Sequence, residues 1–265
     1  MRFALFGGLY SNYLALAAAL ADADRRGVDA VYCLGDMGAF GPQPDRVFPL
    51  LHEFRTDKGH GVQCLRGNYD DSIGHALDDC QCGYTDPRDN HFAQISYDYT
   101  LANTSAKNRA FLRDLPEHAR LEVDGVRILF CHGSPRRVNE FVWKSGSSDA
   151  FLARLSEDYD ADVICGTHTG LHWTRTFAGD RRWLNVGCLG RPANDGRTCV
   201  WYAMLTVDAG CHSVEFIPVE YEHERLAFEM RCERLPEEFI ATIETGWWTT
   251  CLEVLPGKER RAGRW

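Results

Sequence analysis

The sequence predicts an α/β fold, and two features of the first half of the chain indicate it. Short apolar runs alternate with Gly-containing turns and amphipathic segments, which is the βαβ pattern of a sheet with parallel strands. Polar blocks directly follow three of the apolar runs, so their side chains would emerge at the carboxyl ends of strands. Open α/β sheets bind ligands at this edge, and we therefore expect a functional site there.

The first strands and helices follow one another closely along the chain. Residues 2–6 predict a strand, and the Ala- and Leu-rich residues 13–26 predict the helix that follows a Gly-rich turn. Residues 30–34 predict a second strand. Apolar side chains then recur at helical spacing between residues 47 and 54, and residues 61–65 predict a third strand. Two or more parallel strands flanked by helices are expected.

Residues 70–100 have a different texture, rich in Asp, Cys, Asn and Tyr and with little periodicity. We expect an ordered insertion near the site that contains one short helix, with the polar residues 87–91 forming a lid. The Cys80-Gln81-Cys82 pair favours structural thiols or a redox pair over zinc, because a closed zinc site needs four donors. A helix over residues 104–115 is expected to follow.

The remaining elements follow a hairpin signal at Asp124-Gly125, which joins apolar runs on either side. We expect a helix over residues 149–157 and strands over residues 162–165, 183–186, 200–207 and 213–219, the last three being short. Residues 221–248 look helical and amphipathic. We therefore divide the chain into a main domain over residues 1–220 and a C-terminal helical extension packed on it over residues 221–265, with a mobile tail from Lys258.

Charge and cysteine content limit the partners and the compartment. The formal net charge of -9 argues against a general nucleic-acid or membrane-surface binder, which needs clustered Lys and Arg. No apolar run is long enough to span a bilayer. The 11 cysteines lie mostly in strand-like apolar runs, which favours reduced thiols in a cytoplasmic protein. An anionic substrate would have to be met locally, by a metal ion or a few Arg side chains.

Three polar side chains at the predicted strand ends suggest a metal site. Asp36, Asn68 and His132 each follow one of the apolar runs within a few residues. A carboxylate, an amide oxygen and an imidazole together suit a divalent ion such as Mn, Fe, Zn or Ni. Since ligand distances near 2 Å confine such groups to one cluster, we expect these three side chains to converge.

In their order and spacing, these blocks resemble the motifs of the calcineurin-like metallophosphoesterase family, particularly its small bacterial branch. The resemblance covers about residues 2–220 and depends on Gly35-Asp36, Gly67-Asn68, His132-Gly133 and the closing turn at residues 185–192. It implies a four-layer α-β-β-α sandwich of two mixed sheets and hydrolysis of a phosphoester by metal-activated water. In the family, the Asp bridges two metals and the Asn and His bind the second one.

The chain also departs from the family's motifs. The Asp and His of the first motif fall on Gly8 and Tyr10, so both ligands of the first metal are missing. Tyr69 occupies the position of the catalytic His of the third motif. Only His168 remains in the last motif, where it could take either ligand role. The resemblance therefore implies a remodelled centre with one ion, held by Asp36, Asn68, His132 and His168.

Further candidate residues surround this set. Asp70 would orient a neighbouring group, and Tyr10 would either fill the vacated metal position, which we favour, or bind a metal itself. His172 could be a replacement ligand or an exposed loop residue, and the sequence leaves both open. The candidate substrate-binding side chains are Tyr10, Asn12, Tyr69, Arg88, Arg136 and His172. A guanidinium can grip phosphate with two hydrogen bonds, which is why the arginines are included.

The sequence thus predicts a hydrolase that acts on a small anionic or phosphorylated substrate. Without a His at position 69, activity on ordinary phosphomonoesters should be weak, and activated diesters should react better. Two other classes stay open. One is a non-catalytic protein that keeps the cleft to bind an anion, and the other is a single-iron enzyme of different chemistry.

Overall fold

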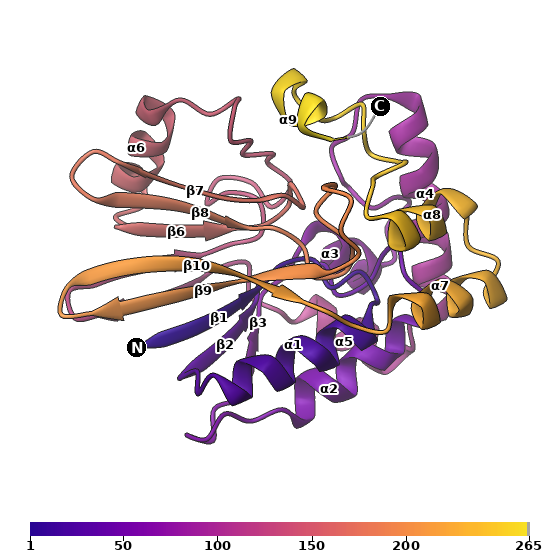
Figure 1. Cartoon of the computed structure of the whole chain (residues 1–265), viewed down its shortest axis with the longest axis horizontal. Helices are drawn as coiled ribbons and strands as arrows, with labels where there is room; N and C mark the ends of the chain where they lie inside the picture. Colours follow the sequence, from indigo (N-terminus) through magenta and orange to yellow (C-terminus); the bar gives the residue numbers. More distant parts are fainter. Residues whose placement is uncertain (264–265) are drawn as a thin grey trace.

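The computed structural model describes residues 1–263, which form two five-stranded sheets packed face to face with helices outside them (Figure 1). The first sheet, in spatial order, contains β10 (Cys211–Val219), β9 (Val200–Asp208), β1 (Arg2–Phe6), β2 (Ala30–Cys33) and β3 (Val62–Cys64). The pairs β1–β2 and β2–β3 are parallel, whereas β9 runs antiparallel to both β1 and β10.

The second sheet is also mixed. Its strands, in spatial order, are β4 (Ala119–Val123), β5 (Val126–Phe130), β6 (Val163–Gly166), β8 (Arg181–Val186) and β7 (His172–Phe177). The predicted hairpin is present as β4–β5, and β5, β6 and β8 are parallel neighbours. The carboxyl ends of β2 and β3 therefore meet those of β5 and β6 where the two sheets pack together.

Helices cover the outer face of each sheet, which completes four layers (Figure 1). The helices are α1 (Tyr13–Arg25), the 3-10 helix η1 (Pro44–Arg46), α2 (Val47–Glu53), α3 (Asn68–His75), α4 (Pro87–Asn103), α5 (Ala106–Arg113), α6 (Asp149–Asp158), α7 (His223–Cys232), α8 (Glu237–Thr245) and α9 (Gly257–Ala262). Leu152 and Leu155 of α6 pack on the second sheet, and α1 and α2 pack on the first. The predicted fold class is confirmed.

Alternation along the strands explains how a single sheet serves two cores. Phe3 and Leu5 of β1 point into the core between the sheets, while Ala4 and Phe6 point to the helices. Between the sheets, the ring of Tyr32 stacks on that of Phe130 with centroids 4.1 Å apart. Both strands of this pair end one to three residues before a candidate metal ligand.

Residues 70–100 hold more helix than the sequence suggested. The prediction of one short helix is wrong, because α3 and the 17-residue α4 both lie in or across this segment. The predicted lid over residues 87–91 is the first turn of α4, which is capped by the side chain of Asp86. Both faces of α4 are occupied: Asp89 accepts a hydrogen bond from Val254 N, and Ser96 and Thr100 accept bonds from the loop after β2. Because polar side chains occupy buried positions of α4, its sequence lacks the helical spacing of apolar residues that would have predicted it.

The C-terminal part differs from the prediction in several details. The single helical stretch over residues 221–248 is two helices, α7 and α8, separated at Pro236. The strands β9 and β10 have nine residues each and are not short, and β7 was not predicted. Part of the expected mobile tail forms α9, where Arg260 donates to the carbonyl oxygen of Leu252. Arg264 lies outside the described residues.

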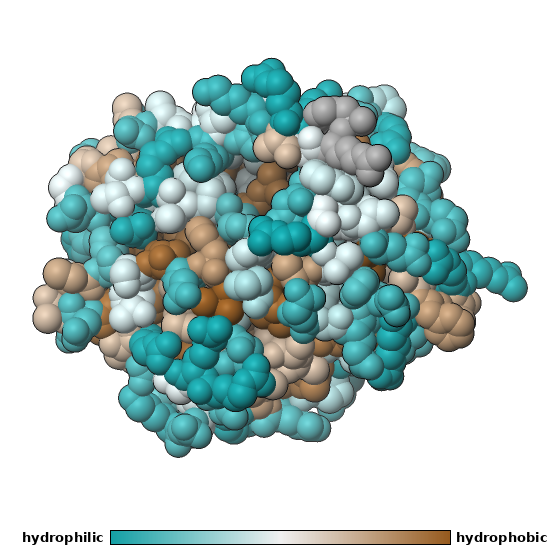
Figure 2. All heavy atoms as spheres, in the orientation of Figure 1, coloured by the Kyte–Doolittle hydropathy of each residue, from teal (hydrophilic) through white to brown (hydrophobic). Residues whose placement is uncertain are grey.

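The surface is mostly polar, as the face in Figure 2 shows, with apolar atoms confined largely to recesses. Large exposed apolar side chains within residues 1–263 are Met1, Leu77 and Phe228. No helix in this described part of the chain is long and apolar enough to cross a membrane.

Candidate metal centre

The loops after β2 and β3 are held together by one buried carboxylate. Asp70 accepts hydrogen bonds from the backbone N–H groups of Asp36 (2.7 Å), Met37 (3.0 Å) and Gly67 (2.8 Å). The chains approach closely here: a Cβ on Gly35, whose φ is 97°, would lie 2.4 Å from the backbone nitrogen of Gly67. Only glycine tolerates both this conformation and this approach.

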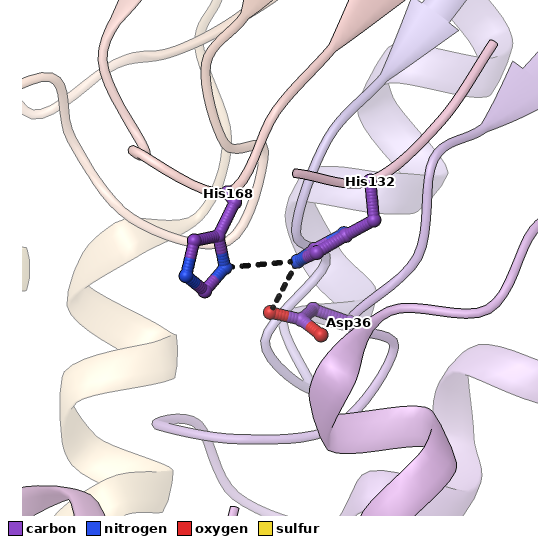
Figure 3. Close-up of side chains that lie close together, drawn as sticks. All are labelled: Asp36, His132 and His168. Carbon is purple, nitrogen blue, oxygen red and sulfur yellow. Dashed lines mark hydrogen bonds and ion pairs between the residues drawn. The ribbon is translucent and has the colours of Figure 1, made fainter. Parts of the chain in front are cut away.

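Three side chains from these loops and from the second sheet meet at one point (Figure 3). One ligand atom each of Asp36, His132 and His168 lies within 4.8 Å of the other two. Nε2 of His132 is 3.2 Å from Asp36 Oδ2 and 3.2 Å from His168 Nδ1. All three residues are almost fully buried, with relative exposures of 3%, 2% and 9%. This grouping is a possible site for a metal ion.

Backbone carbonyls orient both imidazoles toward the point where they meet. His132 Nδ1 is 2.7 Å from the carbonyl oxygen of Leu34, and His168 Nε2 is 3.3 Å from that of Cys82. A carbonyl oxygen only accepts, so each of these two nitrogens carries a proton, and a ring that is neutral has its lone pair on the opposite nitrogen. The opposite nitrogens then present lone pairs to the cluster. Metal-binding histidines are commonly held in this way.

Asn68, at the start of α3, offers a fourth donor. Its Nδ2 donates to the carbonyl oxygen of Cys80 (2.7 Å), which leaves the side-chain oxygen free. That oxygen is buried and has no hydrogen-bond partner within residues 1–263. A buried amide oxygen without a partner is costly, and a divalent cation would satisfy it. An amide oxygen, a carboxylate and two imidazoles are donor types that suit a divalent ion.

The electrostatics of the cluster are those of a coupled, buried group. Burial alone would raise the pKa of Asp36, but the adjacent His132 outweighs it and lowers that pKa. For His132, burial lowers the pKa, and the charge of Asp36 more than compensates, so the pKa is raised. Burial, followed by the charge of His132, lowers the pKa of His168 to about 3. His168 is therefore neutral and able to bind a metal at physiological pH.

Asp70 lies near this cluster without belonging to it. Burial, and next the charge of Asp36, raise the pKa of Asp70 to about 6. Both of its carboxylate oxygens accept backbone N–H groups, so its contacts position the loop that carries Asp36. The sequence predicts that Asp70, as a fourth catalytic candidate beside Asp36, Asn68 and His132, orients a neighbouring group, and its contacts are those of a positioning residue.

A cavity of about 50 Å³ opens beside Asp36 and His168. Its aromatic walls are formed by Tyr10, Phe40, Tyr69, Tyr84, Phe92 and Phe239. Burial raises the pKa of Tyr10 well above its usual value, so its side chain is a neutral phenol. Its ring lies against Gly8, where an added Cβ would come within 2.6 Å of ring atoms. Tyr10 therefore occupies the space that a larger side chain at position 8 would need.

Tyr69 also lines this cavity, and its hydroxyl donates to the carbonyl oxygen of Ala93 (3.2 Å). Asn12, by contrast, does not line the cavity. Its side-chain oxygen caps α1 by accepting from Ala15 N, and its Nδ2 donates to the carbonyl oxygen of Gly190. The expectation that Asn12 contacts substrate is therefore not met, because both ends of its amide are used within the fold.

Three further candidates do not line this cavity, and one of them, Arg136, lines a separate pocket together with His132. Arg88 is exposed at the start of α4 and donates to the carbonyl oxygen of Thr249, and Arg136 pairs with Glu140. Their expected role as anion clamps in this cavity is not met, because neither lines it. His172 is neither a ligand nor an exposed loop residue. It begins β7 and packs between the rings of Trp201 and Phe216, at 4.8 and 4.7 Å.

The two cysteines of the Cys-x-Cys pair are bonded to each other, with Cα atoms 5.3 Å apart. The other nine cysteines of the described part are free. The carbonyl oxygens of Cys80 and Cys82 hold Asn68 and His168, so this loop supports two of the four candidate ligands. The loop thus positions candidate ligands through its backbone carbonyl oxygens.

Arg191 lines the same cavity and was missed by the sequence reasoning. It lies in the closing turn between β8 and β9, next to Gly190 and Pro192, which matched the family pattern. An Arg within a loop carries no periodic signal, so only its burial in the folded structure distinguishes it from the many surface arginines.

Comparison with known proteins agrees with the fold and with the motifs. The family model of the calcineurin-like phosphoesterase superfamily domain matches residues 1–210. The chain therefore belongs to this superfamily, whose members are metallophosphoesterase-type proteins that bind divalent metals. The cluster of Asp36, His132 and His168 is where this chain could hold such an ion.

Individual relatives are distant but cover nearly the whole chain. An uncharacterized protein of Methanocaldococcus jannaschii is 25% identical over 252 residues, covering 88% of this chain and 93% of its own. A hypothetical protein of Pyrococcus horikoshii superposes with a TM-score of 0.74 at 21% identity, covering 94% and 99% of the two chains. A metallophosphoesterase of Sphaerobacter thermophilus gives 0.68 at 24% identity, covering 93% and 99%. At these identities the structural likeness shows the fold.

Proposed function

We propose that the protein hydrolyses a phosphoester with the help of one divalent ion held by Asp36, Asn68, His132 and His168. The observation that carries the proposal is the convergence of a carboxylate with two imidazoles, each oriented by a backbone carbonyl. A divalent ion in such a site supplies Lewis-acid activation of a phosphoryl group and of the attacking water. The family assignment supports the same chemistry.

The residues around the site suggest which substrates react best. Tyr69 is a poor general acid, because burial raises the pKa of its phenol and its hydroxyl already donates to Ala93. Leaving-group protonation contributes about 10²–10⁴-fold in enzymes that have it. We therefore expect small phosphorylated substrates with good leaving groups, such as activated diesters, to react faster than ordinary monoesters. We also propose a cytoplasmic location, because nine of the eleven cysteines are free and the one disulfide of the described part joins the near neighbours Cys80 and Cys82.

Metal analysis of protein purified without a His tag tests the proposal first. We expect about one divalent ion per chain in the wild type and a strong loss in His132→Ala and Asn68→Ala, since each removes a proposed ligand. His91→Ala and Asn90→Ala are matched controls, because both residues are exposed. The controls should retain the ion.

Hydrolysis of bis(p-nitrophenyl) phosphate and p-nitrophenyl phosphate is then measured with the same variants. The proposal expects activity that is higher on the diester, is lost on chelation and is lost in His132→Ala but not in His91→Ala. A protein that binds phosphate without metal and hydrolyses neither compound would be an anion-binding protein. One bound iron with substrate-dependent oxygen consumption would identify a different enzyme class.

A further inference from the structure

Arg191 is a buried cation that has no carboxylate counter-charge within the described residues 1–263. Arg191 is only 6% exposed, yet its guanidinium forms no ion pair with any carboxylate of residues 1–263. Its Nε is buried and has no hydrogen-bond acceptor in that part of the chain. A buried charge without a partner is strongly unfavourable, so a position like this one calls for an anion from outside the protein.

The surroundings hold the guanidinium in one orientation. Its Cζ lies 3.6 Å from the ring centroid of Trp248, and the indole Nε1 of Trp248 donates to the carbonyl oxygen of Pro192 (2.7 Å). The same turn is attached to the loop after β1, because Gly190 N donates to the carbonyl oxygen of Gly8 (2.8 Å). Stacking on an aromatic ring leaves the guanidinium edge available for hydrogen bonds. Arg191 is therefore fixed before any ligand arrives.

Arg191 also faces the same cavity as the candidate metal ligands. It lines the cavity of about 50 Å³ together with Asp36 and His168. One water molecule needs roughly 10–15 Å³ of such a cavity, so the space suits a few waters or one small tetrahedral anion. Asp36 is the sole carboxylate among the described lining residues, and it is already next to His132. A divalent ion beside Asp36 would leave the cavity positively charged.

We propose that Arg191 binds the phosphoryl oxygens of the substrate in the cavity that it lines together with Asp36 and His168, in place of the exposed arginines suggested by the sequence. The chemistry is that of a guanidinium that donates two hydrogen bonds to a tetrahedral oxyanion. The described lining of the cavity contains no other Arg and no Lys, so Arg191 is the residue there that carries a permanent positive charge. This inference rests on the proposed function for the identity of the anion, and it adds the residue that recognises it.

Binding of inorganic phosphate, measured by calorimetry on metal-loaded protein, tests the inference. We expect Arg191→Met to bind phosphate at least about tenfold more weakly than the wild type, because a bidentate charged contact is lost. Arg191→Lys should recover only part of the affinity, since an ammonium cannot form that contact. Arg88→Met is the matched control and should bind as the wild type does. The wild type and the three variants should contain the same amount of metal, because neither Arg191 nor Arg88 is a proposed metal ligand.

Thermal denaturation separates ligand binding from a structural role. If Arg191 serves an anion, Arg191→Met without phosphate should melt at or above the wild-type temperature, because an unpaired buried charge is removed. It should also lose the rise in melting temperature that phosphate causes in the wild type. A variant that melts much lower and still responds to phosphate would overturn the inference.

A crystal structure of the wild type grown with inorganic phosphate gives an answer that needs no variant. An anion within hydrogen-bond distance of Arg191 is expected, and an anion bound only elsewhere would contradict the inference. The two proposals can fail separately. Phosphate bound by Arg191 without hydrolysis of any ester would remove the proposed function alone, whereas metal-dependent hydrolysis with an unchanged KM in Arg191→Met would remove this inference alone.

Discussion

At the scale of single residues, Gly8 and Tyr10 must be treated as a pair. The ring of Tyr10 occupies the place where a side chain at position 8 would begin, with 2.6 Å between its ring carbons and an ideal Cβ. Contacts below 3.0 Å force one of the two groups to move, and Gly8 is buried. The combination of a small residue and a large one at these positions is thus a matter of packing as well as of metal chemistry.

We expect Gly8→Asp alone to be destabilised by roughly 1–3 kcal/mol, because overpacking of a buried site costs about that much. Gly8→Asp combined with Tyr10→His should recover part of the stability and bind a second divalent ion, since it restores the family's two missing donors. Urea denaturation and metal analysis measure these effects. Gly8→Asp with Tyr10→Phe is the control, because it keeps the ring and should stay destabilised.

If that double variant binds two ions, adding Tyr69→His should raise the rate with monoesters more than with activated diesters. The reason is that only poor leaving groups need protonation. An equal effect on both substrates would argue against a general acid at position 69. If Gly8→Asp with Tyr10→His instead lost the single ion, the fold would not tolerate the family's donors at residues 8 and 10.

At the scale of secondary-structure elements, the loops after β2 and β3 depend on Asp70 of α3. Its carboxylate accepts three backbone N–H groups, two of them from the loop after β2. An amide has one acceptor oxygen, so Asp70→Asn would leave at least one buried N–H facing an NH₂ group.

We therefore expect Asp70→Asn to lower the free energy of unfolding by roughly 1–3 kcal/mol, the typical cost of an unsatisfied buried group. Metal affinity should fall as well, because Asp36 is carried by the loop that Asp70 holds. Asp71→Asn is a suitable comparison, since Asp71 is partly exposed, and should change stability by less than about 1 kcal/mol. Equal stability of the two variants would mean that the three contacts contribute little.

The start of β7 provides a test of pH dependence. Burial lowers the pKa of His172 from 6.5 to about 4, so between these values the unfolded chain binds a proton that the folded one does not. This group therefore contributes stability that is fully present above pH 6.5 and is lost as the pH falls toward 4.

In His172→Gln we expect stability to fall less steeply with decreasing pH than in the wild type, by up to about 1.4 kcal/mol per pH unit across this window. Denaturant unfolding at pH 7, 6 and 5 measures the difference. The two slopes should coincide above pH 7. Parallel curves throughout the window would show that His172 keeps its ordinary pKa in the folded protein.

At the scale of the whole molecule, the candidate site exists only where the two sheets are packed together. Asp36 follows a strand of the first sheet, while His132 and His168 follow strands of the second. The stacked rings of Tyr32 and Phe130 connect the two sheets, on strands that end shortly before Asp36 and His132. Metal binding and sheet packing should therefore be linked.

Phe130→Ala should lower the free energy of unfolding by roughly 3–5 kcal/mol, as expected for a large aromatic side chain removed from a core. It should also weaken metal binding, since the loops on either side of the cavity lose their common support. Phe228→Ala is the control, because that ring is 65% exposed and should matter little. A variant that is destabilised but binds metal normally would show that the site does not depend on this packing.

The sequence by itself determined the strands that carry the candidate site and two of its candidate ligands. Local alternation and apolar runs can be read from the chain itself. A polar residue directly after a buried strand must lie at the carboxyl edge of the sheet. This is why β1, β2, β5 and β6 were predicted within a few residues and why Asp36 and His132 were singled out. The family motifs added His168 and the second sheet.

The tertiary structure decided the rest. The helix α4 shows no apolar stripe because it buries polar side chains on several neighbours at once, and β7 is recognisable only beside β8. In the sequence Arg191 looks like any surface arginine, and only the folded structure shows that it is buried and forms no ion pair with a carboxylate of residues 1–263. The spacing of apolar residues in a sequence predicts local helices and strands. Which groups are left buried without a partner depends on elements distant along the chain, and only their packing reveals it.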